Sequence, residues 1–300
     1  MSLLTVFTPT YNRAHTLPRT YHSLCCQTCK DFEWLIIDDG SSDNTKGIVE
    51  KWIKETKEFK IRYIYQKNQG MHGAHNTAYK NITTELNTCI DSDDWMPDNA
   101  VELIVQTWKE KGNDKIAGLI GLDQTSDGKI IGSKFNKDQS LTTLTEFYAN
   151  GGQGDKKLVY RTEIIKNYPE YPIFEGEKYV GLIYKYWLVD KDYKLFTLNK
   201  PLATVEYQLD GSSYNMYSQY LKNPKGFSFL RLTEMKINPS FKRRFISAIH
   251  YVATSIISRN KKFVKESTNK PLTILAIPVG ISWYFIIKSK VKHNKLLKLN

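Results

Sequence analysis

Short apolar runs alternate with amphipathic segments along the first 122 residues. Five apolar runs bounded by polar turns predict buried strands at 3–8, 33–38, 61–66, 86–90 and 116–122. Between them, apolar residues recur at helical spacing over 13–27, 44–58, 73–81 and 97–108. Strands alternating with helices predict an α/β fold with a mostly parallel central sheet flanked by helices.

The pattern is less regular in the second half. Residues 145–161 contain a glycine-rich loop followed by a strand, 174–189 predict an amphipathic helix, and 193–208 predict one or two strands. After residue 220 the segments are helical and basic. We therefore expect an α/β domain over 1–215 and a basic helical C-terminal region over 216–300.

The charge is distributed unevenly. The net charge is +12, yet residues 1–240 hold 30 basic and 30 acidic residues, and residues 241–300 hold 13 basic residues against Glu266 alone. A neutral body with a cationic tail favours an anionic surface as partner over nucleic acid. The N-terminus has no basic start and only a short apolar run, which predicts no signal peptide and a cytoplasmic location.

Three of the predicted strands are followed by unusually polar loops. These are PTYNR (9–13), DDGSS (38–42) and DSDD (91–94). In open α/β sheets, ligands bind outside the carboxyl ends of the strands, where such loops meet. The three loops therefore predict one site.

The DSDD stretch concentrates carboxylates that repel one another unless a cation lies between them. Asp91 and Asp93 are two residues apart at a strand end, so both side chains point the same way in extended backbone. Oxygen ligands suit Mg²⁺ or Mn²⁺, and Mg²⁺ needs only one or two carboxylates when phosphate completes its shell. The alternative is a solvated acidic turn that caps the following helix, with Asp94 as N-cap.

Together these motifs resemble glycosyltransferase family 2, the inverting, nucleotide-sugar-dependent enzymes with the GT-A fold. The resemblance covers about the first 210 residues. The matching segments are TVFTPTYNR (5–13), EWLIIDDGSSDNT (33–45), NQGMHGAHN (68–76), CIDSDDWMPD (89–98) and FEGEK (174–178). Each motif alone is weak, and their order and spacing make the combination specific.

The resemblance implies a role for each loop. Pro9, Tyr11 and Arg13 would line the nucleotide pocket, and Asn68 and Gly70 would shape its floor. Asp39 would recognise the base, most often uracil. Asp91 and Asp93 look like the family's DxD pair, with Asp93 on the divalent cation and Asp91 near the ribose or sugar.

Two positions depart from the family pattern. The family's general base usually comes from a Glu-Asp motif, and here the stretch contains Glu175 and Glu177, followed by Lys178. Glu177 is the predicted base and Glu175 the reserve, although either could simply be favoured at a helix N-terminus. His75 stands where the family more often has Arg, and it could donate a hydrogen bond to phosphate or sugar, or have no ligand at all.

The basic tail contains an uncharged stretch from Pro271 through Ile287. Its length is at the lower limit for a membrane span, and it contains Pro278 and Gly280. We expect an interfacial or re-entrant membrane helix, with Trp283 and Tyr284 at the headgroup level and lysines on anionic lipid. A true span and an ordinary helix packed on the catalytic body remain alternatives.

The sequence thus predicts a metal-dependent inverting glycosyltransferase at the inner face of a bacterial cell membrane. It would transfer a sugar from a nucleotide donor, UDP-linked by resemblance, to a glycan or lipid-linked acceptor in surface polysaccharide synthesis. A nucleotidyltransferase and a non-catalytic, membrane-bound nucleotide-sugar-binding protein are the alternatives.

Overall fold

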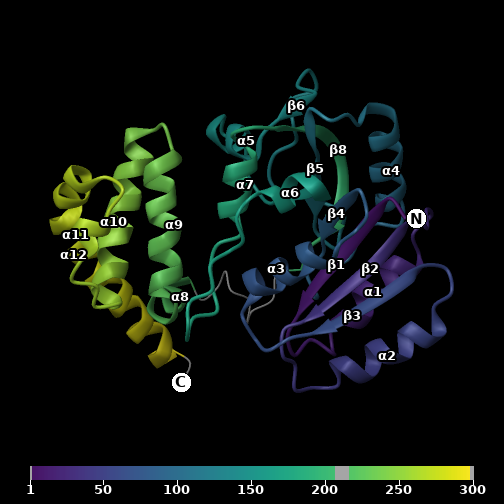
Figure 1. Cartoon of the computed structure of the whole chain (residues 1–300), viewed down its shortest axis with the longest axis horizontal. Coiled ribbons are helices and arrows are strands. Elements are labelled where there is room, and N and C mark those ends of the chain that lie inside the picture. The colour runs from purple at the N-terminus through teal and green to yellow at the C-terminus, as the bar shows by residue number, and fades with distance from the viewer. Residues whose placement is uncertain (1, 207–215, 298–300) are drawn as a thin grey trace. The chain divides into compact units, whose positions relative to one another are not determined.

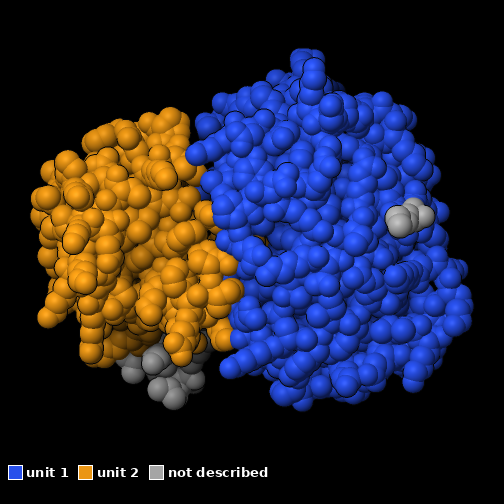
Figure 2. All heavy atoms as spheres, viewed as in Figure 1, with its two compact units in different colours: residues 1–170, 185–207 blue, residues 171–184, 208–300 orange. Residues whose placement is uncertain are grey.

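The computed structural model describes residues 2–206 and 216–297 (Figure 1). The chain forms two compact units, coloured separately in Figure 2. Unit 1 comprises residues 1–170 and 185–207, and unit 2 comprises 171–184 and 208–300. The predicted division at residue 215 lies outside the described residues. Segment 171–184 belongs with the C-terminal helices, a grouping that local periodicity does not reveal.

Unit 1 is built on one mixed sheet, which contains eight strands within the described residues. The strands are β1 Leu4–Thr10, β2 Phe32–Asp38, β3 Lys60–Tyr65, β4 Leu86–Cys89, β5 Ile116–Gln124, β6 Leu141–Thr142, β7 Lys156–Arg161 and β8 Lys194–Thr204. Their order is β3-β2-β1-β4-β7-β5-β8-β6. The first four pair in parallel, whereas β7 is antiparallel to both of its neighbours.

Helices connect these strands. They are α1 Leu17–Cys25, α2 Thr45–Glu55, α3 Met71–Asn81, α4 Ala100–Lys111, α5 Leu144–Ala149, α6 Thr162–Asn167 and α7 Ile183–Val189. All seven positions of β1 and of β2 are buried, as expected for parallel strands covered on both faces. Tyr21, Trp34 and Trp52 stack between α1, β2 and α2, with the Tyr21 and Trp52 rings 4.4 Å apart.

The five predicted strands and the α/β class are confirmed. The predicted helix over 174–189 is wrong for its first half, because only 183–189 is helical. Gly176 has φ +79°, a left-handed conformation that interrupts a helix at this position. The helix predicted from Pro97 begins three residues later, at Ala100.

Unit 2 contains α8 Met216–Lys222, α9 Pro224–Ile237, α10 Phe241–Ile257, α11 Phe263–Glu266 and α12 Lys270–Leu297. Helices α9, α10 and α12 share a core that includes Met235, Tyr251 and Leu272. At Gly280 the backbone of α12 comes so close to α10 that an added Cβ would lie 2.5 Å from Val252 Cβ. The helical prediction for this region is confirmed in the described residues.

Candidate active site

The loops after β1 and β2 interlock. Asn12, at φ +53°, donates its backbone N–H to Ser41 Oγ at 2.8 Å, and its Oδ1 accepts the Ser42 backbone N–H at 2.8 Å. Because β2, β1 and β4 are adjacent and parallel, the loops after these strands leave the same edge of the sheet. The predicted assembly of PTYNR, DDGSS and DSDD at one edge thus follows from the topology.

Asp39 organises the segment predicted to form the pocket floor. Its side chain is buried, and Oδ1 accepts from Gln66 Nε2 at 2.7 Å and from the Gln69 backbone N–H at 2.8 Å. Oδ2 accepts the Gly70 backbone N–H at 2.7 Å. Gly70 has φ +84°, which suits glycine at this turn. Base recognition by Asp39 stays a prediction, and its contacts define it as the anchor of residues 66–70.

The other predicted pocket residues differ in exposure. Tyr11 is 51% exposed, so its ring is available to a ligand, whereas Pro9 is buried within β1. Asn68 is half-buried against the second loop, where a Cβ on Gly40 would lie 3.0 Å from the Asn68 backbone nitrogen. Arg13 is half-buried, and its charge lowers the pKa of Asp93 against the stronger effects of burial and of Asp91.

The acidic segment 91–94, hereafter the acid loop, is held by α1 and by its own turn. The Asp94 backbone N–H donates to the Asp91 carbonyl at 3.0 Å. Arg19 Nη2 donates to the Asp93 carbonyl at 2.5 Å, and Thr20 Oγ1 donates to the Asp94 carbonyl at 2.7 Å. These contacts engage the backbone of the acid loop, and Asp91 Oδ1 accepts a weak hydrogen bond from Cys89 Sγ at 3.7 Å.

The acid-loop carboxylates perturb one another. Burial, followed by the charge of Asp91, raises the pKa of Asp93 above its ordinary value. Burial and the charges of Asp91 and Asp93 raise the pKa of Asp94 to about 8. The solvated N-cap alternative for Asp94 is wrong, because Asp94 is 6% exposed and Asn99 is the N-cap of α4.

These carboxylates suit a hard divalent cation whose remaining ligands would be phosphate oxygens of a nucleotide. Like charges that raise one another's pKa are relieved by a cation, and carboxylate oxygens suit Mg²⁺ or Mn²⁺. Within the described residues, no group of three or more His, Cys, Asp or Glu side chains forms a metal cage. Mg²⁺ in nucleotide sites commonly takes one or two carboxylates plus phosphate oxygens, a set that Asp91 and Asp93 could supply in part.

His75 is fully buried on α3. Its ring meets Phe7 edge-on with centroids 5.0 Å apart, Nδ1 lies 3.4 Å from Tyr79 Oη, and Nε2 lies 3.7 Å from Cys89 Sγ. Burial, aided by the charge of Lys185, lowers the pKa of His75 to about 3, so its imidazole is neutral at pH 7. Contact with a donor stays a prediction, and any such contact would be made by an uncharged ring.

Lys157 on β7 is a candidate that the sequence reasoning missed. Its Nζ donates to the Cys89 carbonyl at 3.2 Å, just before the acid loop. Burial alone would lower the pKa of Lys157, but the charges of Asp123, Asp94 and Asp91 outweigh it and raise the pKa. Asp123 is 3% exposed, and its Oδ1 has no hydrogen-bond partner. The KKLVYR pattern does not indicate which lysine faces these acids.

The predicted base residues, Glu175 and Glu177, belong to unit 2, whereas the three strand-end loops belong to unit 1. Glu177 is buried, and its Oε1 and Oε2 accept the backbone N–H groups of Lys225 and Gly226 at 3.0 and 2.9 Å. These donors belong to the first turn of α9, where a carboxylate is favoured. Glu175 is exposed. The role of either residue as general base stays a prediction.

Residues 5–168 match the family model described as glycosyl transferase family 2, so this chain belongs to that family. An uncharacterised glycosyltransferase of Nostoc sp. is 31% identical over 180 residues, which cover 57% of this chain and 54% of that protein. The chain thus spans about half the length of that relative. The GalNAc(5)-diNAcBac-PP-undecaprenol beta-1,3-glucosyltransferase of Campylobacter jejuni is 26% identical across 100% of this chain and 97% of its own length.

Solved structures establish the fold class. TarS 1–349 of S. aureus, crystallised with UDP-GlcNAc, superposes with a TM-score of 0.63 at 19% identity, covering 94% of this chain and 81% of that one. The mannosyltransferase PcManGT of Pyrobaculum calidifontis, crystallised with GDP-Man and Mn²⁺, gives a TM-score of 0.52 at 14% identity over 99% of this chain and 81% of its own. The predicted GT-A fold is confirmed.

Proposed function

We propose that this chain transfers a sugar from a UDP-linked donor to a glycan or lipid-linked acceptor, with inversion at the anomeric carbon. The setting is the synthesis of a bacterial surface polysaccharide. The single observation that carries the proposal is the crowded acid loop at the strand edge that it shares with the PTYNR and DDGSS loops. The family match and the glycosyltransferase names of the relatives support the reaction class over nucleotidyl transfer.

The donor would lie against the interlocked loops after β1 and β2. The exposed ring of Tyr11 offers a face on which a planar base can stack, and Arg13 supplies positive charge beside Asp93. Asp39 would act chiefly by holding residues 66–70 in shape, since both of its oxygens already accept protein hydrogen bonds. The TarS complex with UDP-GlcNAc supports a UDP-linked donor.

Asp93, with Asp91 beside it, would hold Mg²⁺ or Mn²⁺. When bound, such a cation supplies positive charge that neutralises the departing nucleoside diphosphate. Asp91 would also accept a hydrogen bond from the ribose or sugar. Lys157 would offset part of the negative charge of the acid loop.

The acceptor hydroxyl must lose its proton as its oxygen bonds to the anomeric carbon and the bond to the diphosphate breaks. A carboxylate on the face opposite the leaving group would take that proton. Glu175 is exposed, whereas Glu177 is buried and each of its oxygens accepts one backbone hydrogen bond, from Lys225 and from Gly226. Each Glu177 oxygen keeps a second lone pair, so both glutamates remain candidates for the base, and Glu175 is the more accessible of the two.

Conservative substitutions distinguish these two glutamates. If Glu175 is the base, Glu175→Gln lowers kcat by roughly 10²–10⁴-fold with unchanged thermal stability. Glu177→Gln would then chiefly lower the melting temperature, because it weakens the cap of α9. The reverse result, a stable Glu177→Gln without turnover, would assign the base to Glu177.

We further propose that unit 2 binds the membrane through one face of α12. Within the described residues, one helix segment, 270–292, is long and apolar enough to cross a membrane, judged by length and composition alone. One side of α12 packs on α10, and the other exposes apolar side chains. The exposed ones are Ile274, Leu275, Val279, Ile281, Phe285 and Ile286. A helix that packs on protein along one side and exposes apolar side chains along the other is more consistent with a helix lying in the membrane interface than with one crossing the bilayer.

Vesicle flotation tests the membrane proposal. Wild type should float with phosphatidylglycerol vesicles more than with phosphatidylcholine vesicles, because the tail is cationic. Replacing Leu275, Val279 and Phe285 with serine should abolish flotation, whereas Ile53→Ser, a matched exposed apolar site in unit 1, should not. Equal flotation of the two variants would refute the proposal, and retention of wild type in the membrane through carbonate extraction would favour a span.

The non-catalytic alternative is favoured by one observation, the engagement of both Glu177 oxygens in the cap of α9. Release of UDP from a panel of UDP-sugars in the presence of Mn²⁺ separates the two functions. An enzyme releases UDP with turnover that disappears in Asp93→Ala. A binding protein shows donor-dependent thermal stabilisation with no UDP release.

A further inference from the structure

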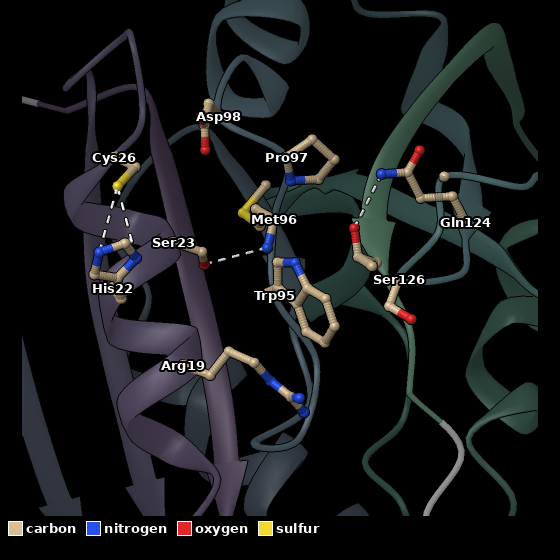
Figure 3. A pocket seen from close by; sticks show the side chains of 12 residues that line it. Arg19, His22, Ser23, Cys26, Trp95, Met96, Pro97, Asp98, Gln124 and Ser126 are labelled. Carbon is tan, nitrogen blue, oxygen red and sulfur yellow. Dashed lines mark hydrogen bonds between the residues drawn. The ribbon is translucent and has the colours of Figure 1, made fainter.

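A cavity of about 570 Å³ lies in unit 1 beside the acid loop (Figure 3). One wall is α1, the facing wall is the end of β5 with the hairpin that follows it, and segment 95–98 lies between them. None of the residues predicted to hold the donor lines this cavity. It is therefore separate from the predicted nucleotide pocket, although it begins two residues after Asp93.

The cavity combines one aromatic ring with several kinds of polar group. Trp95 is half-buried in it, while His22, Asp98 and Ser126 are exposed at its rim. The face of the Trp95 ring that Arg19 does not cover would meet the weakly positive C–H groups of a pyranose, and imidazole, carboxylate and hydroxyl groups suit the sugar's hydroxyls. The volume also lies within the range of roughly 300–1,000 Å³ typical of ligand cavities.

Arg19 ties the cavity to the acid loop. Its guanidinium lies over the Trp95 ring at 4.2 Å, donates to the Asp93 carbonyl at 2.5 Å and pairs with Glu206 at 2.5 Å. Ser23 Oγ accepts the Met96 backbone N–H at 3.2 Å, which holds the same segment against α1. The Trp95 ring is thus positioned before any ligand binds. A glycan acceptor that extends away from the acid loop would reach this ring.

We propose that this cavity is a subsite for a sugar unit of the acceptor glycan, an assignment that rests on the proposed function. A phosphate group fits it poorly, because the charge of Arg19 is already balanced by Glu206 and the rim carries the anionic Asp98. An acyl chain fits poorly too, because the rim is polar. The nucleotide of the donor is assigned to the loops after β1 and β2, and its sugar to the side of Asp91, which does not line the cavity, so the acceptor is the remaining source of a sugar.

A plug variant and a matched control test the subsite. Ser126→Trp fills the cavity from its exposed rim, and Lys129→Trp puts the same side chain on the same hairpin at a position that does not line it. The probes are N,N′-diacetylchitobiose and cellobiose, added without donor to ¹⁵N-labelled protein. The readout is the Trp95 indole N–H resonance, assigned with Trp95→Phe.

At least one probe should shift the Trp95 resonance saturably in wild type and in Lys129→Trp, with binding at least 10-fold weaker in Ser126→Trp. UDP binding should be the same in all three proteins. No shift in wild type with either probe, or equal binding in the plug and the control, would overturn the subsite. Failure of wild type to bind UDP or turn over any donor would instead count against the proposed function, since the resonance is read without donor.

Discussion

Asp39 and the carboxylates of the acid loop follow parallel strands at the same edge of one sheet, yet their surroundings differ. Asp39 is buried with three protein donors on its two oxygens. The acid-loop side chains instead raise the pKa values of their neighbours, and the charges of Lys157, Arg13 and Arg19 offset this effect in part. A carboxylate satisfied by the protein holds the structure, and carboxylates left in mutual repulsion are suited to a cation.

The strongest test of this contrast is Asp93→Asn. Transfer should fall roughly 10²–10³-fold, because the charge that holds the cation is lost. The stability of the metal-free protein should not decrease, since the substitution relieves repulsion within the acid loop. Kinetics with excess Mn²⁺ and urea unfolding in chelator measure the two quantities. A variant that keeps wild-type turnover would remove Asp93 from the reaction.

Asp39→Ala should show the opposite pattern. Removing a buried carboxylate leaves the N–H groups of Gln69 and Gly70 without acceptors, which should cost roughly 3 kcal/mol of unfolding free energy. Asp39→Asn keeps one acceptor oxygen and should cost less. Urea unfolding checks both values, and a fully stable Asp39→Ala would mean that the carboxylate is not an anchor.

Lys157→Met tests the lysine whose positive charge partly offsets the negative charge of the acid loop. We expect a loss of about 2 kcal/mol in chelator, less than for breaking a fully buried pair because the side chain is half-buried. Mn²⁺ should restore part of the loss, because a cation can replace the missing charge. Lys157→Arg is the control. Identical losses with and without Mn²⁺ would separate Lys157 from the cation site.

The smallest expected effect concerns Lys185, a buried cation on α7 whose Nζ lies 4.8 Å from the centroid of the Tyr79 ring. Burial lowers the pKa of Lys185 to about 8 in the folded protein. Between this pH and the ordinary pKa of lysine in the unfolded chain, the unfolded state binds more protons than the folded state, so stability rises with pH. Relative to Lys185→Met, wild type should gain about 1–2 kcal/mol between pH 7.5 and 9.5. Paired urea unfolding at the two pH values measures this, and a difference that does not change with pH contradicts it.

The two halves of the chain also differ in how far the sequence predicts them. Regular alternation of strands and helices gives the order of unit 1 as far as β5, and motif spacing brings Asp91 and Asp93 to the edge with Tyr11. Strand direction is not encoded in local pattern, so the antiparallel β7 that brings Lys157 to the acid loop could not be predicted. Likewise, the cap formed by Glu177 depends on residues 48 and 49 positions later.

The central claim is that the acid loop binds a cation together with the diphosphate of the donor. Calorimetric titration of UDP into wild type and Asp93→Asn, each with Mn²⁺ and with chelator, tests it most directly. Mn²⁺ should tighten UDP binding to wild type at least 10-fold and leave the affinity of Asp93→Asn unchanged. Equal UDP affinity of wild type in Mn²⁺ and in chelator would contradict the claim.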